Sequence, residues 1–192
     1  MRLAIVYVIA LLFLSCNNKK HENSLFQLVE DSGIDFDNKV EDDSLENSFL
    51  FRNFYNGGGV AIGDINNDGL PDVFLTSNQG ANKLYLNKGN FKFEDISDRA
   101  GIIRDDKWNT GVVFADINGD GWLDIYVCSS GRMRTGNRKN KLYINNGPSP
   151  SGKGRGEVSF TESAAQYGLD ISAYTTQVSF LITISMVTWI VL

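Results

Sequence analysis

The amino-acid sequence contains an internal repeat, and this feature constrains the fold more than any other. Three motifs occur twice, in the same order, along the 192-residue chain. The pairs are residues 59–72 with 111–124, residues 82–87 with 140–145, and residues 91–94 with 158–161. A shorter element occurs three times, as Phe26 with Gly33-Ile34, Phe93 with Gly101-Ile102, and Phe160 with Gly168-Leu169. We therefore expect a stack of similar units, each packed against its neighbours.

Each repeat predicts four short strands. In the first copy they cover residues 59–63, 72–77, 83–87 and 91–96, with a turn at 87–90. The second copy contains extra residues at 129–139 and 148–157, which predict longer surface loops. Four strands in about 50 residues are typical of a propeller blade. The sequence thus predicts an all-β fold, an incomplete β-propeller made of four-stranded blades.

An Asp-rich loop joins the first two strands of each copy. Both loops carry oxygen-bearing side chains at positions 1, 3, 5 and 9, with Gly at position 6 for a sharp turn, and the backbone carbonyl at position 7 is a further candidate. The predicted ligands are Asp64, Asn66, Asp68, Leu70 and Asp72 in the first loop, and Asp116, Asn118, Asp120, Trp122 and Asp124 in the second. Oxygen ligands without His or Cys favour calcium over zinc, and the strict octahedral geometry of magnesium makes it less suitable. Two Ca²⁺ sites are predicted.

A simpler interpretation is that Asp, Asn and Gly only form turns in these loops. Agreement of the two loops at all the key positions favours calcium binding over this alternative. The Asp clusters are poor candidates for acid–base catalysis, because nothing in the sequence indicates an apolar pocket that would raise a pKa. Trp108 and Trp122 could stack on a sugar, but packing between blades is the favoured role.

The order of these elements resembles the FG-GAP/VCBS repeat family, the calcium-binding propellers found at the head of integrin α chains. The segment 51–60, Phe-Arg-Asn-Phe-Tyr-Asn-Gly-Gly-Gly-Val, is similar to the cell-surface branch related to cartilage acidic proteins, the ASPIC group. The resemblance covers roughly residues 24–180. It implies a calcium-stabilised module for binding or adhesion.

The first residues predict a lipoprotein signal peptide at 1–15. Arg2 precedes an almost wholly apolar stretch from Leu3 to Leu14, which ends in Leu-Ser-Cys16 and resembles a bacterial lipobox, although Phe13 stands where Leu is usual. Cys16 is the predicted lipidation site, and residues 16–24 would form a polar tether. The alternative is an ordinary signal peptide cleaved near Ser15. We expect a lipid-anchored protein of the bacterial cell envelope, at the outer membrane or cell surface.

The composition excludes several classes of function. The net charge is −5 and no long basic run is present, so we expect no nucleic-acid partner. The single histidine, His21, argues against a histidine-based zinc site or a Ser-His triad. Once Cys16 is assigned to lipidation, Cys128 remains alone in a strand-like stretch and is expected to be a buried thiol.

The C-terminal residues do not continue the repeat. Residues 174–180 parallel 108–114, so a third Asp-rich loop is expected to begin at position 182, but residues 181–192 are apolar instead. The codons for this stretch can encode Asp-Tyr-Asp-x-Asp-Gly-Asp-Leu-Asp in a shifted frame. We therefore expect an out-of-frame tail on a truncated or frameshifted fragment. The alternative is a genuine apolar tail, which would be too short for an ordinary membrane-spanning helix.

These observations define the expected organisation and function. The predicted segments are a signal peptide (1–15), a tether (16–24), a leading segment with an outer-strand element (25–53), repeat 1 (54–102), repeat 2 (103–170), the start of repeat 3 (171–180) and the out-of-frame tail (181–192). We expect a non-catalytic, calcium-stabilised binding or adhesion module, with a protein or glycan ligand on the propeller face and the lipid anchor in the membrane. The alternative is an N-terminal fragment of a larger surface enzyme or polysaccharide-processing protein.

Overall fold

A computed structural model describes residues 25–105, 107–131, 136–147, 158–182 and 189–191. Contacts divide the chain into two units, Met1–Glu30 and Asp31–Leu192. The predicted signal peptide, Cys16, the whole tether and the predicted loop at 148–157 lie outside the described residues. Within the first unit, Leu25, Phe26 and Leu28 are strongly exposed. The description that follows concerns the second unit.

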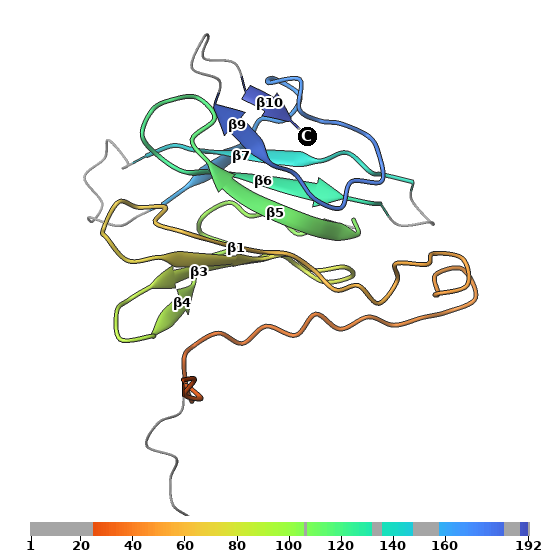
Figure 1. The fold of residues 1–192 in the computed structure, drawn as a ribbon, viewed down its shortest axis with the longest axis horizontal. Coiled ribbons are helices and arrows are strands. Elements are labelled where there is room, and N and C mark those ends of the chain that lie inside the picture. The colour runs from red at the N-terminus through yellow and green to blue at the C-terminus, as the bar shows by residue number, and fades with distance from the viewer. Residues whose placement is uncertain (1–24, 106, 132–135, 148–157, 183–188, 192) are drawn as a thin grey trace, which may run out of the picture. The chain divides into compact units, whose positions relative to one another are not determined.

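The second unit contains two four-stranded antiparallel sheets (Figure 1), each in the order of the sequence. We call the first sheet blade 1 and the second blade 2. Blade 1 consists of β1 (Val60–Gly63), β2 (Asp72–Leu75), β3 (Lys83–Asn87) and β4 (Phe93–Asp95). Blade 2 consists of β5 (Asn109–Ala115), β6 (Asp124–Ser129), β7 (Lys141–Asn145) and β8 (Phe160–Glu162). A short hairpin of β9 (Phe180–Ile182) and β10 (Trp189–Val191) follows.

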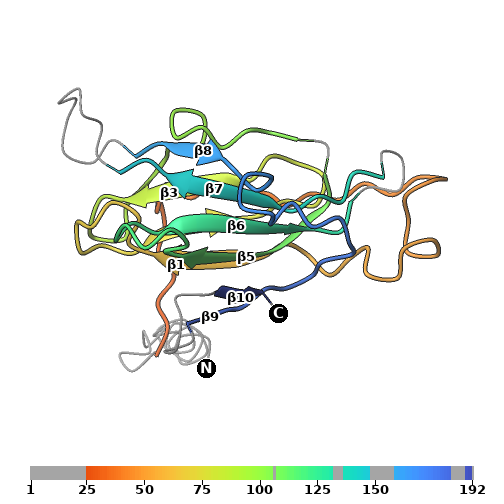
Figure 2. The same cartoon turned by 90° about the horizontal axis from the view of Figure 1, so that it is seen from above.

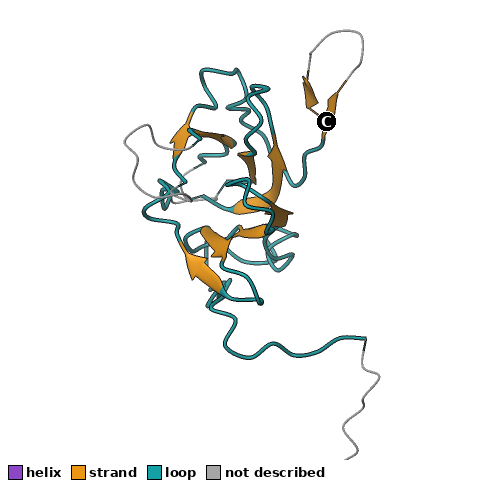
Figure 3. Ribbon diagram, turned by 90° about the vertical axis from the view of Figure 1, so that its left-hand side faces the viewer, coloured by secondary structure: helices purple, strands orange, loops and turns teal. Residues whose placement is uncertain are grey.

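The described residues form strands and loops without a helix, as the view in Figure 3 shows. This confirms the predicted all-β fold and the four-stranded blades of an incomplete propeller. No helix among the described residues is long and apolar enough to cross a membrane.

One predicted strand begins later than expected. The last strand of blade 1 was expected from Phe91, but β4 begins at Phe93. Asn90 and Phe91 both have a left-handed backbone, with φ of 54° and 56°, and Lys88 N–H bonds back to the Lys92 carbonyl at 2.7 Å. Phe91 is therefore part of the turn, and its apolar side chain is exposed.

The main hydrophobic core lies between the two blades. Phe74 and Leu84 of blade 1 and Ile125, Val127 and Tyr143 of blade 2 are all fully buried in it. Strands β2 and β6 are each the second strand of their sheet. Both carry buried or half-buried apolar side chains on the two faces of the sheet. Burial of apolar surface at about 25 cal/mol per Å² makes this interface the dominant stabilising contact between the blades.

A second core covers the other face of blade 2. Tyr126, Cys128 and Leu142 pack there with Val178 and Phe180 from the segment that leads into β9. The rings of Tyr126 and Phe180 meet edge to face, with centroids 5.4 Å apart. Cys128 is free and buried, as predicted, and burial raises the pKa of its thiol to about 12. The thiol is therefore protonated and unreactive at neutral pH.

The first strands of successive blades lie side by side, as Figure 2 shows for β1 and β5. Glycine allows the close approach. A Cβ atom at Gly59 would lie 2.6 Å from the Thr110 carbonyl oxygen, and one at Gly111 would lie 2.6 Å from that of Thr176. Thr176 therefore lies next to blade 2 in the same way that Thr110 lies next to blade 1. The segment before β9 takes the position of the first strand of a third blade.

The segment 31–40 packs on blade 1 with alternating exposed and half-buried residues. Phe93 N–H donates to the Ser32 carbonyl at 2.8 Å, just as Phe160 N–H donates to the Ala100 carbonyl at 2.8 Å. The Tyr85 hydroxyl donates to the Asp35 carbonyl at 3.0 Å. The repeated Gly-Ile element therefore contacts the outer strand of the following blade in both places.

Candidate metal centre

The two Asp-rich loops adopt the same internal hydrogen-bond pattern. In the first loop, Asp68 N–H donates to Asp64 Oδ1 at 3.1 Å and to Asn66 Oδ1 at 3.2 Å. Asn66 Nδ2 lies 2.9 Å from Asp68 Oδ2. The side chains at positions 1, 3 and 5 therefore converge on one point of the loop, as a curled cation-binding loop requires.

The second loop repeats this arrangement. Asp120 N–H donates to Asp116 Oδ1 at 3.0 Å and to Asn118 Oδ1 at 3.1 Å, and Asn118 Nδ2 lies 2.7 Å from Asp120 Oδ2. Gly69 and Gly121, at position 6, have φ of 86° and 87°. A residue with a side chain would be strained in this left-handed conformation, which accounts for Gly at this position.

The structure separates the position-9 carboxylates from the other three side chains. Asp72 Oδ2 accepts from Ile65 N–H at 3.0 Å and its Oδ1 accepts from Asn87 N–H at 2.8 Å. Asp124 makes the equivalent bonds, with Ile117 N–H at 2.9 Å and Asn145 N–H at 2.8 Å. Each of these carboxylates connects its loop to the third strand of the same blade.

The position-7 residues are in place next to position 5. Leu70 N–H donates to Asp68 Oδ1 at 2.8 Å, and Trp122 N–H donates to Asp120 Oδ1 at 2.9 Å. The other carboxylate oxygen of Asp68 and of Asp120 accepts from the side-chain amide of the Asn at position 3 of the same loop. Within the described part of the chain, no three His, Cys, Asp or Glu side chains stand close enough together to form a metal site by themselves.

Electrostatics distinguishes position 9 from the exposed part of the loop. The pKa of Asp72 is raised to about 6, mainly by burial; hydrogen bonds from Asn87 and Ile65 oppose the shift, and the negative charges of Asp68 and Asp64 add to it. Burial also raises the pKa of Asp124, for the same combination of reasons. A cation held near these carboxylates would relieve the repulsion, because it favours their charged form.

The donor set fits a hard cation. Positions 1, 3 and 5 of each loop bring together carboxylate and amide oxygens on an exposed loop, and no thiolate or imidazole lies among them. Bound Ca²⁺ would supply positive charge to a loop that otherwise concentrates three Asp residues. Asp64, Asn66 and Asp68 would hold it in the first loop, and Asp116, Asn118 and Asp120 in the second.

Three asparagines take part in ways that the sequence analysis did not predict. Asn67 Nδ2 donates to the Gly121 carbonyl at 3.1 Å and so connects the two Asp-rich loops. Asn145 Nδ2 donates to the Ile65 carbonyl at 2.9 Å, across from blade 2 to blade 1. Asn87 caps Asp72. The repeated motif contains Asn87 and Asn145 at equivalent positions, and this recurrence was the signal that could have identified them.

Comparison with known proteins agrees with the geometry. Residues 46–127 match the family model described as FG-GAP-like repeat. This stretch is similar to FG-GAP-like repeats. It contains all of blade 1, the whole second Asp-rich loop and most of β6.

The chain also has relatives among named proteins. Cartilage acidic protein 1 of Xenopus tropicalis is 40% identical over 77 residues, which is 40% of this chain and 12% of the relative. The Mus musculus protein of that name is 38% identical over 69 residues, 36% of this chain and 11% of the relative. The Homo sapiens protein is 38% identical over 72 residues, 37% of this chain and 11% of the relative. The match thus spans about an eighth or less of each relative's length.

Proposed function

We propose that this chain forms part of a calcium-stabilised β-propeller that binds a protein or glycan ligand at the bacterial cell surface and has no catalytic activity. The observation that carries the proposal is the identical convergence of positions 1, 3 and 5 in two loops that follow the first strand of successive blades. Two chance turns would have no reason to share these contacts. The similarity to FG-GAP-like repeats supports the same assignment.

The role of calcium in this proposal is structural. The Asp-rich loops lie between the first and second strands of each blade, and Asn67 connects one loop to the other. An ion that binds only the folded loops would raise the free energy of unfolding. We therefore expect 1 mM CaCl₂ to raise the melting temperature of the purified chain by about 5 °C or more relative to EDTA.

Two Asp-to-Ala variants test the calcium assignment, one in the second Asp-rich loop and one outside both loops. Asp120→Ala removes a loop carboxylate and is expected to reduce the calcium-dependent rise, as measured by differential scanning fluorimetry. Asp98→Ala is the control, because Asp98 is an exposed residue outside both loops. A melting temperature that does not respond to calcium, or an equal response in both variants, would overturn the assignment of the loops.

The lipid anchor is proposed from the sequence alone, since Cys16 lies outside the described residues. Incorporation of an alkyne-labelled fatty acid in a bacterial host tests it. Cys16→Ala should abolish the label, whereas Cys128→Ala, which removes a buried thiol, should retain it. Label that persists after Cys16→Ala would contradict Cys16 as the lipidation site, and absence of label from the wild-type chain would favour ordinary signal-peptide cleavage.

A further inference from the structure

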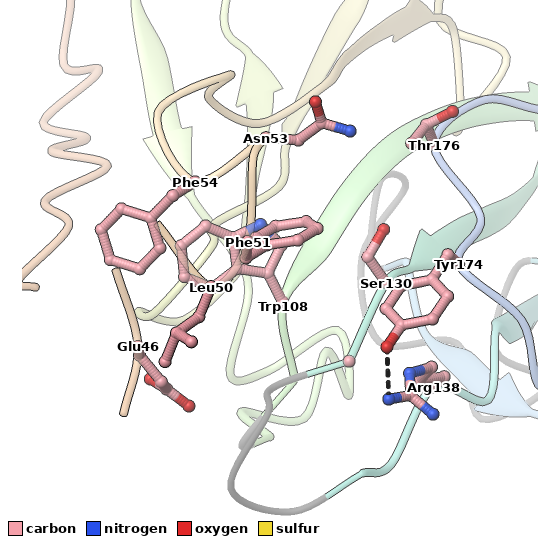
Figure 4. Close-up of a pocket in the computed structure, with 11 residues that line it drawn as sticks. Glu46, Leu50, Phe51, Asn53, Phe54, Trp108, Ser130, Arg138, Tyr174 and Thr176 are labelled. Atoms are coloured by element: carbon pink, nitrogen blue, oxygen red, sulfur yellow. Dashed lines mark hydrogen bonds between the residues drawn. The ribbon is translucent and has the colours of Figure 1, made fainter. Parts of the chain in front are cut away.

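A pocket of about 300 Å³ opens at the end of the blades opposite the Asp-rich loops, near the start of β5. One wall is mainly apolar and includes Leu50, Phe51 and Phe54 from the loop that precedes β1, together with Trp108, while Glu46 and Asn53 of the same loop also line it (Figure 4). The opposite wall consists of Ser130 and Arg138 of blade 2 and of Tyr174 and Thr176 from the segment before β9. Four separate parts of the chain thus build it: the loop before β1, Trp108, the connection between β6 and β7, and the segment before β9.

The aromatic side chains of the apolar wall pack against one another. Trp108 is buried, and its ring lies 4.9 Å from that of Phe54 and 5.7 Å, edge to face, from that of Phe51. The Trp108 carbonyl accepts from Ser130 N–H at 2.9 Å, which joins the two walls. Such a wall of aromatic side chains favours an apolar group in the pocket.

The opposite wall presents a guanidinium group. Arg138 lies over the ring of Tyr174, 4.2 Å from its centroid, and donates to the Tyr174 hydroxyl at 2.7 Å. Gly131 makes room for this side chain, since a Cβ there would meet the Arg138 Cγ at 2.3 Å. The Nε of Arg138 is buried, yet it has no hydrogen-bond acceptor among the described residues. A buried donor of this kind is costly to leave without an acceptor.

We propose that this pocket binds an extended peptide segment of a protein partner, with an apolar side chain between the aromatic rings and a neighbouring carboxylate on Arg138. A guanidinium matches a carboxylate with two parallel N–H···O bonds, one of which would satisfy the Nε. The proposal rests on the binding function proposed above and specifies its partner.

The surroundings favour a peptide over a glycan. Phe49 and Tyr55 flank the pocket along the same loop and are 98% and 64% exposed. Large apolar side chains in water at the rim of a pocket are typical of protein–protein contacts. A sugar would need an open ring face, but Trp108 is buried and Arg138 covers one face of Tyr174. The volume also suits one large side chain and its neighbours better than an oligosaccharide.

The experiment is a selection of random heptapeptides on the full chain. We expect sequences with Asp or Glu within two positions of an aromatic or aliphatic residue to be enriched. Fluorescence polarisation of the most enriched peptide should then show about tenfold weaker binding to Arg138→Gln. Arg99→Gln is the control, because Arg99 lies in an exposed ion pair with Glu94 in blade 1 and does not line the pocket.

Several outcomes would overturn the inference. They are the absence of acidic enrichment, equal binding of the peptide to Arg138→Gln, or binding of tetragalacturonate that depends on Arg138 and excludes the peptide. The calcium proposal is judged separately from the melting temperature in CaCl₂. A chain that calcium stabilises but that selects no acidic peptide contradicts only the pocket assignment, and peptide binding without calcium stabilisation contradicts only the loops.

Discussion

At the scale of single residues, the position-9 aspartates have a different role from the rest of their loops. Asp72 and Asp124 are fully buried and accept backbone N–H groups from the loop and from the third strand of the blade. The other loop carboxylates are exposed or half-buried. One carboxylate therefore fixes the loop on the blade, while the others are available to a cation.

The raised pKa of Asp72 predicts a pH dependence of stability. Because its folded-state pKa of about 6 exceeds the ordinary value of 3.8, the folded chain binds the proton more tightly than the unfolded chain. The free energy of unfolding should therefore fall as the pH rises from about 4 to about 6, and stay level above that window. In EDTA, the melting temperature should be higher at about pH 5 than at about pH 7.

The control for this pH dependence is a comparison of two variants. Asp72→Asn should reduce the difference in melting temperature between the two pH values, whereas Asp98→Asn, at an exposed position, should leave it unchanged. An unchanged difference in Asp72→Asn would show that another group is responsible.

The sequence predicted which residue types occur in these loops. It did not predict that the position-9 carboxylate binds backbone N–H groups while the other side chains stay available to a cation. The spacing of Asp64, Asn66, Asp68 and Asp72 reads as one set of ligands. The structure assigns the last of them to backbone groups, because Asn87 and Ile65 present N–H donors at a buried position. Ile65 and Asn87 lie outside the ligand spacing of the loop, so that spacing alone does not indicate them, although the recurrence of Asn87 as Asn145 could have done so for one of the two donors.

At the scale of elements, the blades are held together by the faces of their sheets. Strand β6 is buried along its whole length, between blade 1 and the segment that leads into β9. The repeat predicted its existence from residues 124–129, since both copies place an apolar run after the Asp-rich loop. Strand ends were less predictable, because at Phe91 a left-handed turn replaced the expected alternation.

Truncation of a side chain between the blades tests this packing. Ile125 is fully buried in the core between blade 1 and blade 2, so Ile125→Ala should lower the free energy of unfolding by about 2–5 kcal/mol in urea. Ile103→Ala is the matched control, because Ile103 is 62% exposed, and should change it by less than about 0.5 kcal/mol. Similar losses in both variants would show that the blades do not pack as described.

At the scale of the whole second unit, the β1 part of one face of blade 1 is exposed. Val60 and Ile62 on β1 are 58% and 66% exposed, whereas Val112, the counterpart of Val60 in blade 2, is only 6% exposed. Blade 1 covers that position of blade 2, but nothing equivalent covers β1 among the described residues. Blade 1 therefore exposes on β1 the apolar positions that, in blade 2, pack against a neighbouring blade.

Self-association follows from this open face. We expect the chain to associate at micromolar concentration, and Ile62→Lys to reduce that association in sedimentation velocity, since a charge on the face is costly to bury. Ile103→Lys, which adds the same charge at another exposed isoleucine, should have little effect. Equal behaviour of the two variants would assign the association to another surface.

The two ends of this stack of sheets are chemically different. Blade 1 ends in the exposed β1 face, while the far side of blade 2 is covered by Val178 and Phe180. A contact between the open β1 face of one copy and the far side of blade 2 of another would not form a two-fold symmetric dimer, because each added subunit would present a fresh copy of the open face. Such growth is directional, and it stops only when the rotation per step closes a ring; otherwise it continues as a filament.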